Sequence, residues 1–303
     1  MAANAPPAGT WVDRWSDRIL RALLWLMMRL PYTWRVPLMG RLMGRLIGPL
    51  SGYRRRARRH LAMVYPNMPP ATRKRLATDV CDNFGRTLIE NYSWQELGAR
   101  LSDTTPTGPG VAAVAEAAAS GTPVIFVTGH FGNHEAPRHV LTQMGYTIGG
   151  LYRPMANAYF NAHYAKTMSS WGGPVFAQGR QGTIGFAKHL KSGGMATLLF
   201  DVANAGGENI SFLGHPARTA LSAAELAIRF NAVVIPYFAV RQADGLSFDI
   251  FVEDPITHGP PIQMMQEATR RLEAQVEKHP SQWFWVHRRW KQPKSRKADA
   301  ADQ

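Results

Sequence analysis

Apolar runs of strand length alternate with helical stretches through the middle of this 303-residue chain, and this alternation constrains the fold most. The strand-like runs cover residues 122–128, 196–200, 233–240 and 247–252. The helical stretches between and around them cover residues 112–120, 135–144, 156–170, 182–191 and 220–230. Such alternation is typical of a largely parallel sheet with helices on its faces. We therefore predict an α/β fold with a central, mostly parallel or mixed sheet flanked by helices.

The flanking sequence divides the chain into four parts. Residues 1–10 are small and proline-rich, the tail 291–303 is polar, and both are predicted to be disordered. Residues 11–100 are predicted to be a helical region at a membrane interface, with one or two helices over 11–50 and a long helix over 70–98. Residues 101–290 are the predicted α/β core, which ends in a helix over 261–279.

The helical region carries most of the positive charge. The chain has a formal net charge of +14, and its first 60 residues hold twelve arginines against two aspartates. Over residues 11–30 arginines share one helix face, and leucine, isoleucine and tryptophan lie on or near another, which is typical of a helix in the plane of a membrane surface. An ordinary surface helix is the alternative. No apolar run reaches the roughly 18 residues that span a bilayer, and no signal peptide is expected.

A second basic feature is the run 54–59, which holds five arginines in six positions. It fits an anionic partner, such as membrane phosphates, an acidic carrier protein or nucleic acid, or it is a solvated helix face. The run has no interleaved aromatic residues and no RNA-recognition signature, so no nucleic acid partner is expected. The single cysteine, Cys81, excludes an internal disulfide and a cysteine zinc cluster.

The stretch 128–135, TGHFGNHE, is the predicted chemical centre. The strand before it ends at Gly129, so His130 lies at the C-terminal end of a strand, where α/β sheets bind ligands. Asn133 is predicted to cap the next helix, which places Glu135 in the first helical turn. The Glu135 carboxylate can then hold one nitrogen of the His130 ring while the other accepts a proton from a substrate hydroxyl. No serine or cysteine stands in a nucleophile elbow here, which favours direct attack by the substrate.

Two other interpretations of this stretch stay open. His130 and His134 are four apart with Glu135 beside them, as metal ligands often are, but Gly132 and Asn133 interrupt the helical register that a zinc motif needs. No metal is therefore predicted. The other interpretation is a structural turn whose polar side chains are satisfied internally.

Residues 129–135 resemble the HX4(D/E) motif of glycerolipid-type acyltransferases, and more closely the GHFGNWE block of the lipid A biosynthesis acyltransferases. Further blocks similar to that family follow in order over about residues 50–291: RHL to YP at 59–66, NFG at 83–85, YRP to N at 152–157, LKSGG leading to D at 190–201, FLG to T at 212–219 and WFWVHRRWK at 283–291. His60, His134 and Val202 depart from the residues usual in the family.

The resemblance implies transfer of a fatty acyl chain from the thioester of acyl-carrier protein or acyl-CoA to a hydroxyl of a lipid A precursor, an anionic glycolipid. It further implies a glycerolipid-acyltransferase-like core and a peripheral or monotopic place on the cytoplasmic face of a bacterial inner membrane. His130 is the expected general base, with Glu135 as its partner and no cofactor. The residues expected to bind substrate or stabilise an oxyanion are Arg153, Asp201, Arg180 and Asn133.

Three alternatives to this function remain. One keeps the chemistry but takes a lysophospholipid, aminolipid or glycosylated lipid as acceptor. The others are a protein without catalytic activity that binds membranes, and one that binds nucleic acid through residues 54–59.

Overall fold

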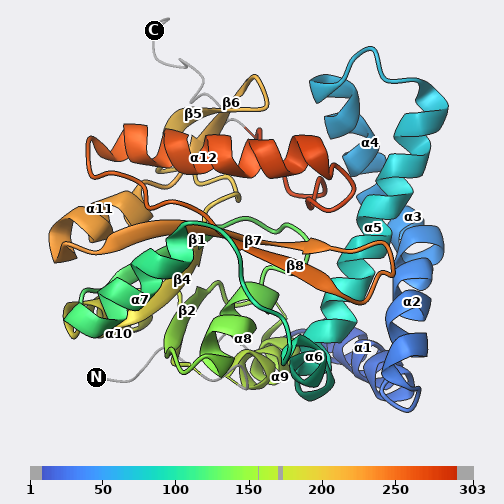
Figure 1. Ribbon diagram of the computed structural model, residues 1–303. Coiled ribbons are helices and arrows are strands. Elements are labelled where there is room, and N and C mark those ends of the chain that lie inside the picture. The colour runs from blue at the N-terminus through green and yellow to red at the C-terminus, as the bar shows by residue number, and fades with distance from the viewer. Residues whose placement is uncertain (1–8, 156, 170–172, 292–303) are drawn as a thin grey trace, which may run out of the picture.

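A six-stranded sheet forms the centre of the computed structural model, which describes residues 9–155, 157–169 and 173–291 (Figure 1). The strand order is β3-β2-β4-β1-β7-β8, and all neighbours are parallel except the antiparallel pair β7–β8. The bounds are Val124–Thr128 for β1, Ile148–Tyr152 for β2, Val175–Ala177 for β3, Met195–Leu199 for β4, Val233–Arg241 for β7 and Phe248–Val252 for β8. The predicted α/β class with a mostly parallel sheet is confirmed.

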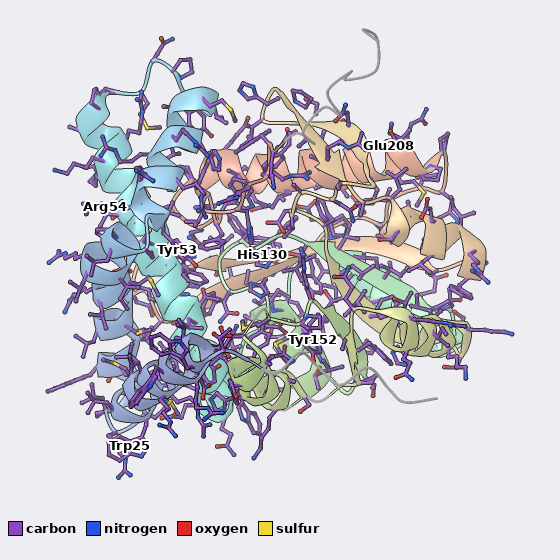
Figure 2. The ribbon with its side chains drawn as sticks, turned by 180° about the vertical axis from the view of Figure 1, so that it is seen from behind. Trp25, Tyr53, Arg54, His130, Tyr152 and Glu208 are labelled. Atoms are coloured by element: carbon purple, nitrogen blue, oxygen red, sulfur yellow. The ribbon has the colours of Figure 1, made fainter. Side chains whose placement is uncertain are left out.

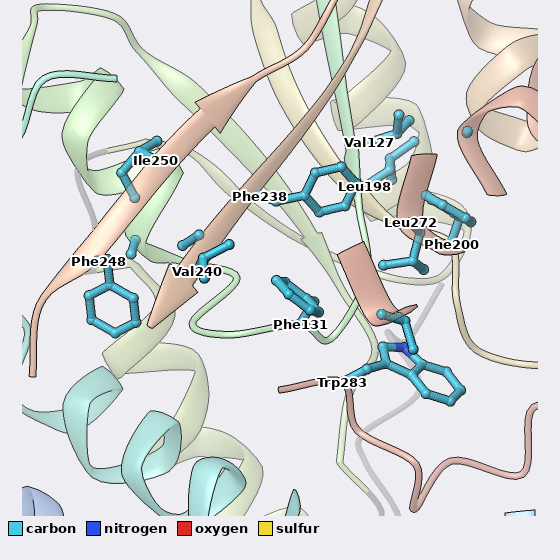
Figure 3. Close-up of a cluster of buried hydrophobic side chains, with 14 of the residues drawn as sticks. Val127, Phe131, Leu198, Phe200, Phe238, Val240, Phe248, Ile250, Leu272 and Trp283 are labelled. Carbon is cyan, nitrogen blue, oxygen red and sulfur yellow. The ribbon is translucent and has the colours of Figure 1, made fainter. Parts of the chain in front are cut away.

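Both faces of the sheet are covered, as the apolar strands require. Val124 and Phe126 of β1 pack in the layer that contains residues of α7 (Gly110–Ser120) and α8 (Ala136–Gln143). Ile125 and Val127 point to the opposite face, which α10 (Arg180–Lys191), α11 (Ser222–Phe230) and α12 (Pro261–Lys278) cover. Figure 3 shows this second layer, in which Val127 lies among aromatic and aliphatic side chains of neighbouring strands and of α12.

Four strands were not predicted. β2 holds Gly149 and Gly150, whose low strand propensity weakens the pattern. Their lack of a side chain has a structural reason, because a Cβ at Gly149 would approach the His189 ring to 3.2 Å. β3 has only three residues, and β5 (Glu208–Phe212) and β6 (His215–Thr219) form a separate antiparallel pair.

Residues 11–101 are largely helical, and their helices gather along one side of the sheet (Figure 1). They form α1 (Trp11–Met27), α2 (Tyr32–Leu42), a π-helical turn (Met43–Ile47), α3 (Gly48–Leu50), α4 (Tyr53–Val64), α5 (Pro70–Tyr92) and α6 (Trp94–Leu101). The predicted helix over 70–98 is therefore two helices. It breaks at Ser93, where φ is −105° and ψ is 34°, and the Ser93 hydroxyl donates to the carbonyl of Ile89.

The helical region shares its hydrophobic core with the α/β part. One cluster of buried side chains includes Leu24 of α1, Leu61 of α4 and Trp285 near the end of the described chain. No helix in the described ranges is long and apolar enough to cross a membrane.

The expected disorder at both ends falls mostly outside the described residues, in 1–8 and 292–303. Gly9, Thr10 and Lys291 are exceptions that the structure describes: Thr10 caps α1, and the N–H of Lys291 donates to the carbonyl of Arg288. The Thr10 hydroxyl accepts a hydrogen bond from the backbone N–H of Asp13, and the Asp13 carboxylate accepts one from the N–H of Thr10. Helix α9 (Ala158–Ser169) lies against α1 and carries Tyr159, whose hydroxyl accepts from Arg14.

Candidate active site

Two neighbouring strands deliver the central pair of side chains. In the parallel register of β1 and β4, Thr128 lies opposite Leu199, so the residues two positions further on, His130 and Asp201, leave the sheet side by side. His130 Nδ1 lies 2.8 Å from Asp201 Oδ1, and the His130 backbone N–H donates to Oδ2 at 2.8 Å. Figure 2 shows His130 near the middle of the molecule, between the helical region and the sheet.

Asp201 is fully buried but remains a carboxylate. Burial alone would raise the pKa of the Asp201 carboxyl, but the charge and hydrogen bonds of His130 outweigh it and hold this pKa well below its usual range. Trp283 Nε1 donates a further hydrogen bond to Oδ2 at 2.9 Å. Because an ionised carboxylate cannot donate, Nδ1 of His130 carries a proton, and when the ring is neutral its Nε2 is the acceptor. The His130 side chain is 29% exposed, so a substrate can reach it.

The loop after His130 is held by the C-terminal segment. The N–H of Gly132 donates to the carbonyl of Gln282, and the N–H of Phe284 donates to the carbonyl of His130, both at 2.9 Å. Gly132 has a φ of +54°, and a Cβ there would lie 1.8 Å from the carbonyl oxygen of Ala239. Only glycine fits this turn, and the turn fixes the direction in which the His130 ring points.

Two more histidines surround the His130 ring. The ring centroid of His287 lies 4.3 Å from that of His130, and the centroid of His134 lies 5.1 Å away. Burial, with the His130 charge adding to it, lowers the pKa of His134 to about 4 and that of His287 to about 3. Both rings are therefore neutral at neutral pH. Nε2 of His287 is buried and has no hydrogen-bond partner in the described structure.

Glu135, predicted to hold the His130 ring, contacts other groups. Its carboxylate lies 3.3 Å from Arg138 NH1 and 4.0 Å from His134 Nε2, and Arg138 is fully buried. Among the contacts of these described residues there is none between Glu135 and the His130 ring. The prediction is corrected on this point, because the parallel register brings Asp201 to Nδ1, while the turn directs Glu135 towards its own helix.

Asn133 is also placed differently from the prediction. Helix α8 begins at Ala136, and its N-cap is Glu135 instead of Asn133. The Asn133 side chain is buried, with Oδ1 accepting from the N–H of Glu135 and Nδ2 donating to Glu90. Glu90 in turn binds Arg241, which corrects the expected substrate contact, because the Asn133 amide already serves a buried internal network.

The two predicted anion-binding arginines are exposed and lie on neighbouring elements. Arg153 directly follows β2, which pairs with β4. Arg180 is the first residue of α10. Neither has a hydrogen bond or ion pair with the described residues around His130, so their expected roles remain predictions.

A largely apolar pocket of about 200 Å³ opens beside His130. Its apolar wall comes from α5, Met155 and the C-terminal segment, and includes Val80, Phe84, Leu88 and Phe284. His287 and Asn91 also line it, and the Oδ1 atom of Asn91, like Nε2 of His287, is buried without a partner. The pocket suits a hydrocarbon chain with a polar group at its His130 end.

One group in the described chain has the spacing of metal ligands. Possible ligand atoms of His130, Asp201 and His287 lie within 4.8 Å of one another, so the group differs from the His130–His134 pair considered from the sequence. Both Asp201 oxygens already accept hydrogen bonds, one of them from the ring of His130. A cation at Asp201 would have to displace that ring proton, so the contacts favour proton transfer over metal binding.

The importance of His287 and Trp283 at the centre was missed from the sequence. Both belong to the block WFWVHRRWK at 283–291, which the sequence marks only as part of the family resemblance. The sequence feature that points to them is the presence of a histidine and tryptophans in the segment that follows the last helix. Such a segment is free to close over the C-terminal ends of the strands.

The order of these elements along the chain can be compared with known proteins. No curated protein matches the chain. The family model of the bacterial lipid A biosynthesis acyltransferases matches residues 9–292, which includes His130, Asp201 and the segment that closes over them. The chain therefore belongs to the bacterial lipid A biosynthesis acyltransferase family, and acyl transfer is its general activity.

Proposed function

We propose that the protein transfers a fatty acyl chain from the thioester of acyl-carrier protein or acyl-CoA to a hydroxyl of a lipid A precursor. The observation that carries the proposal is the His130–Asp201 hydrogen bond at the mouth of the apolar pocket. A neutral imidazole with a free Nε2, oriented by a buried carboxylate, is suited to remove a proton from an alcohol. The pocket next to it suits the acyl chain.

In the proposed reaction His130 Nε2 accepts the proton of the acceptor hydroxyl as its oxygen attacks the thioester carbonyl. A C–O bond forms, and the tetrahedral intermediate then expels the thiolate as the C–S bond breaks. The protonated His130 returns its proton to that thiolate. Asp201 stabilises the transient imidazolium, because its carboxylate lies against Nδ1.

The negative charge on the tetrahedral intermediate needs a donor. His287 is neutral, and its Nε2 is buried without a partner at the pocket next to His130. We assign Nε2–H of His287 to hydrogen-bond the developing oxyanion. Arg153 and Arg180 are the remaining candidates for anion contacts.

The test of this proposal is mass spectrometry of lipid A from a strain that lacks the gene. We expect loss of one secondary acyl chain, restored by the natural protein and not by His130→Ala, which removes the base; thermal unfolding of the purified variant checks that it still folds without the hydrogen bond from His130 to Asp201. The control is His258→Ala, because the His258 ring hydrogen-bonds the carbonyl of Ala232 just before β7, at the opposite end of the strands from His130. If lipid A is unchanged and the phospholipids or aminolipids are altered, the acceptor is one of those lipids, and the proposed acyl transfer through His130 still holds.

We further propose that α1 places the protein in the plane of the membrane, on the cytoplasmic face where acyl donors occur. Apolar side chains at helical spacing along α1 are exposed, with Trp11 at 75%, Trp15 at 55%, Ile19 at 67% and Leu26 at 57%. Arginine lies against two of the α1 tryptophans, for example Arg18 at 5.2 Å from the Trp15 ring. Exposed aromatic side chains beside arginine suit the headgroup region.

Flotation with vesicles of phosphatidylethanolamine and phosphatidylglycerol tests this placement. We expect Trp15→Ser/Ile19→Ser to weaken vesicle binding by about tenfold or more, from the lost apolar contact. The matched control is Ile228→Ser/Ile262→Ser, which removes exposed apolar side chains from α11 and α12. An equal loss in both variants would contradict the assignment to α1.

A further inference from the structure

A second, basic cleft is lined in part by the same C-terminal segment as the apolar pocket. It measures about 860 Å³ and opens between α4 and the end of the described chain. Its cationic lining consists of Arg55, Arg56, Arg59, Arg288 and Lys291. No carboxylate lines it, so the cleft concentrates positive charge on facing walls.

The two walls are joined by specific contacts. NH1 of Arg56 donates to the carbonyl of Val286 at 3.2 Å, and Nδ1 of His60 lies 2.7 Å from the carbonyl of Trp285. The His60 ring also packs edge-on against Trp290, with centroids 5.2 Å apart. Backbone and aromatic contacts therefore hold the two walls together, and Arg56 is fixed in place before a ligand binds.

These cations have no acidic partners in the described part of the chain. Arginines elsewhere, such as Arg86 and Arg271, form ion pairs with carboxylates, but none of the five cations of the cleft does so. Like charges that face each other across a cleft repel and are stabilised by an anion between them. Arginine forms bidentate hydrogen bonds with phosphate oxygens, which makes a phosphate group the anion that fits best.

The position of the cleft links it to the active site. Arg288 lines the cleft and directly follows His287, which lines the apolar pocket and whose ring contacts His130. The cleft is also separate from the outer face of α1, because Figure 2 shows Tyr53 and Arg54 of α4 well away from Trp25. Adjacent residues of one segment thus line the two places, which favours a single ligand that carries both a phosphate and a reacting group.

We propose that this cleft binds a phosphate group of one of the two substrates while the reacting group of that substrate lies at His130. The proposal rests on the proposed function only in assigning the transfer reaction to His130. The phosphate belongs either to the sugar headgroup of the acceptor or to the phosphopantetheine arm of the donor. The chemistry of recognition is the same in both cases, and the experiment separates them.

The helix that lines the cleft offers a matched pair of variants. Arg55→Gln/Arg59→Gln removes two cations from the cleft, at a spacing of four residues. Arg54→Gln/Arg58→Gln removes two cations at the same spacing from the same helix, but neither residue lines the cleft. Both variants lose the same charge, so a general effect of charge on anions or membranes changes them equally.

The first measurement is calorimetric titration of the full-length protein with inorganic pyrophosphate, which needs no catalysis. We expect the cleft variant to bind pyrophosphate at least about tenfold more weakly than the natural protein. The control variant should bind it within about twofold of the natural value. Equal weakening in both variants, or no weakening in the cleft variant, would overturn the proposal.

The second measurement is the KM of each substrate in the transfer reaction. A rise of about tenfold confined to the acceptor assigns the cleft to the sugar phosphate, and a rise confined to the donor assigns it to the pantetheine phosphate. A cleft variant with both KM values unchanged contradicts the proposal. If the natural protein transfers no acyl group, the proposed function fails, and pyrophosphate binding still decides whether the cleft is a phosphate site.

Discussion

The end of β4 and the start of α8 each supply a buried carboxylate near His130, and the two differ in what they contact. Asp201 at the end of β4 accepts hydrogen bonds from the His130 ring, the His130 backbone and Trp283. Glu135 at the start of α8 faces Arg138, which donates through Nε to the carbonyl of Ile148 in β2. The first carboxylate therefore acts on the ring that reacts, and the second ties a helix to a strand. Proximity in sequence does not tell which carboxylate serves the base.

The largest effect should come from Asp201→Asn. The amide keeps the size of the side chain, but its NH2 group faces Nδ1 and favours the tautomer that carries its proton on Nε2. We expect kcat to fall by about 1,000-fold or more with little loss of thermal stability. The measurement is transfer from acyl-carrier protein to a lipid A precursor, with thermal unfolding as the control. A fall in kcat of less than tenfold would contradict the assignment of Asp201, and not Glu135, as the partner of the base.

Glu135→Gln should mainly affect stability. The change leaves the fully buried Arg138 guanidinium without its carboxylate, which we expect to cost about 3 kcal/mol in the free energy of unfolding. The folded variant should keep kcat within about tenfold of the natural value. Urea unfolding and the transfer assay check the two halves. If kcat falls as far as in Asp201→Asn while stability is kept, Glu135 is the partner of the base after all.

The histidines beside the base should make stability fall with acid. The pKa of His134 is about 4 and that of His287 about 3 in the folded protein, below the unfolded value near 6.5. The unfolded chain therefore takes up these protons first, and stability is lost as the pH falls below about 6.5. From pH 7 to pH 5 we expect a loss of about 2 kcal/mol for each histidine.

Asp201 does not contribute to that loss. Its lowered pKa in the folded protein means that the ionised carboxylate stabilises the fold, and this contribution is lost only as the pH falls through about 4 and below. Urea unfolding at pH 7 and pH 5 measures this loss of stability, and His134→Phe should reduce it by about 2 kcal/mol. A loss that His134→Phe leaves unchanged would show that the His134 ring is not kept neutral by burial.

The smallest expected effect is that of metal removal. If Asp201 acts as a hydrogen-bond partner, dialysis against EDTA should leave the transfer rate unchanged within error. Elemental analysis of the purified protein accompanies the assay. A rate that falls on dialysis and returns with Zn²⁺ would instead assign His130, Asp201 and His287 as metal ligands.

Much of this arrangement could be predicted from the sequence. The rest depends on which strands are neighbours in the sheet and on the register in which they pair. The apolar runs before His130 and Asp201 predict two strands, and both residues were singled out as site residues. The pattern does not say that β1 and β4 are neighbours, so it cannot place Asp201 against His130. Glu135 is five residues from His130 and was preferred because only local geometry was available.

The missed parts share a physical cause. β2 carries two glycines, so its strand signal is weak, although the space that they leave is used by side chains of other elements. The helical break lies at Ser93, whose hydroxyl accepts a hydrogen bond from Nε of Arg35, 58 positions away in sequence. His287 is important only because residues 282–284 pair with the loop after β1. Contacts of this range are set by tertiary structure, which single-residue preferences do not encode.

The pairing of residues 282–284 with the His130 loop also has a consequence for the order of events during synthesis. A ribosome makes the chain from its N-terminus, so α1 emerges well before Trp283. Until Trp283 and Phe284 have emerged, Asp201 lacks one of its donors and the turn at Gly132 lacks its support. A nascent chain can therefore bind the membrane surface through α1, as we propose, before its active site is able to react with a thioester.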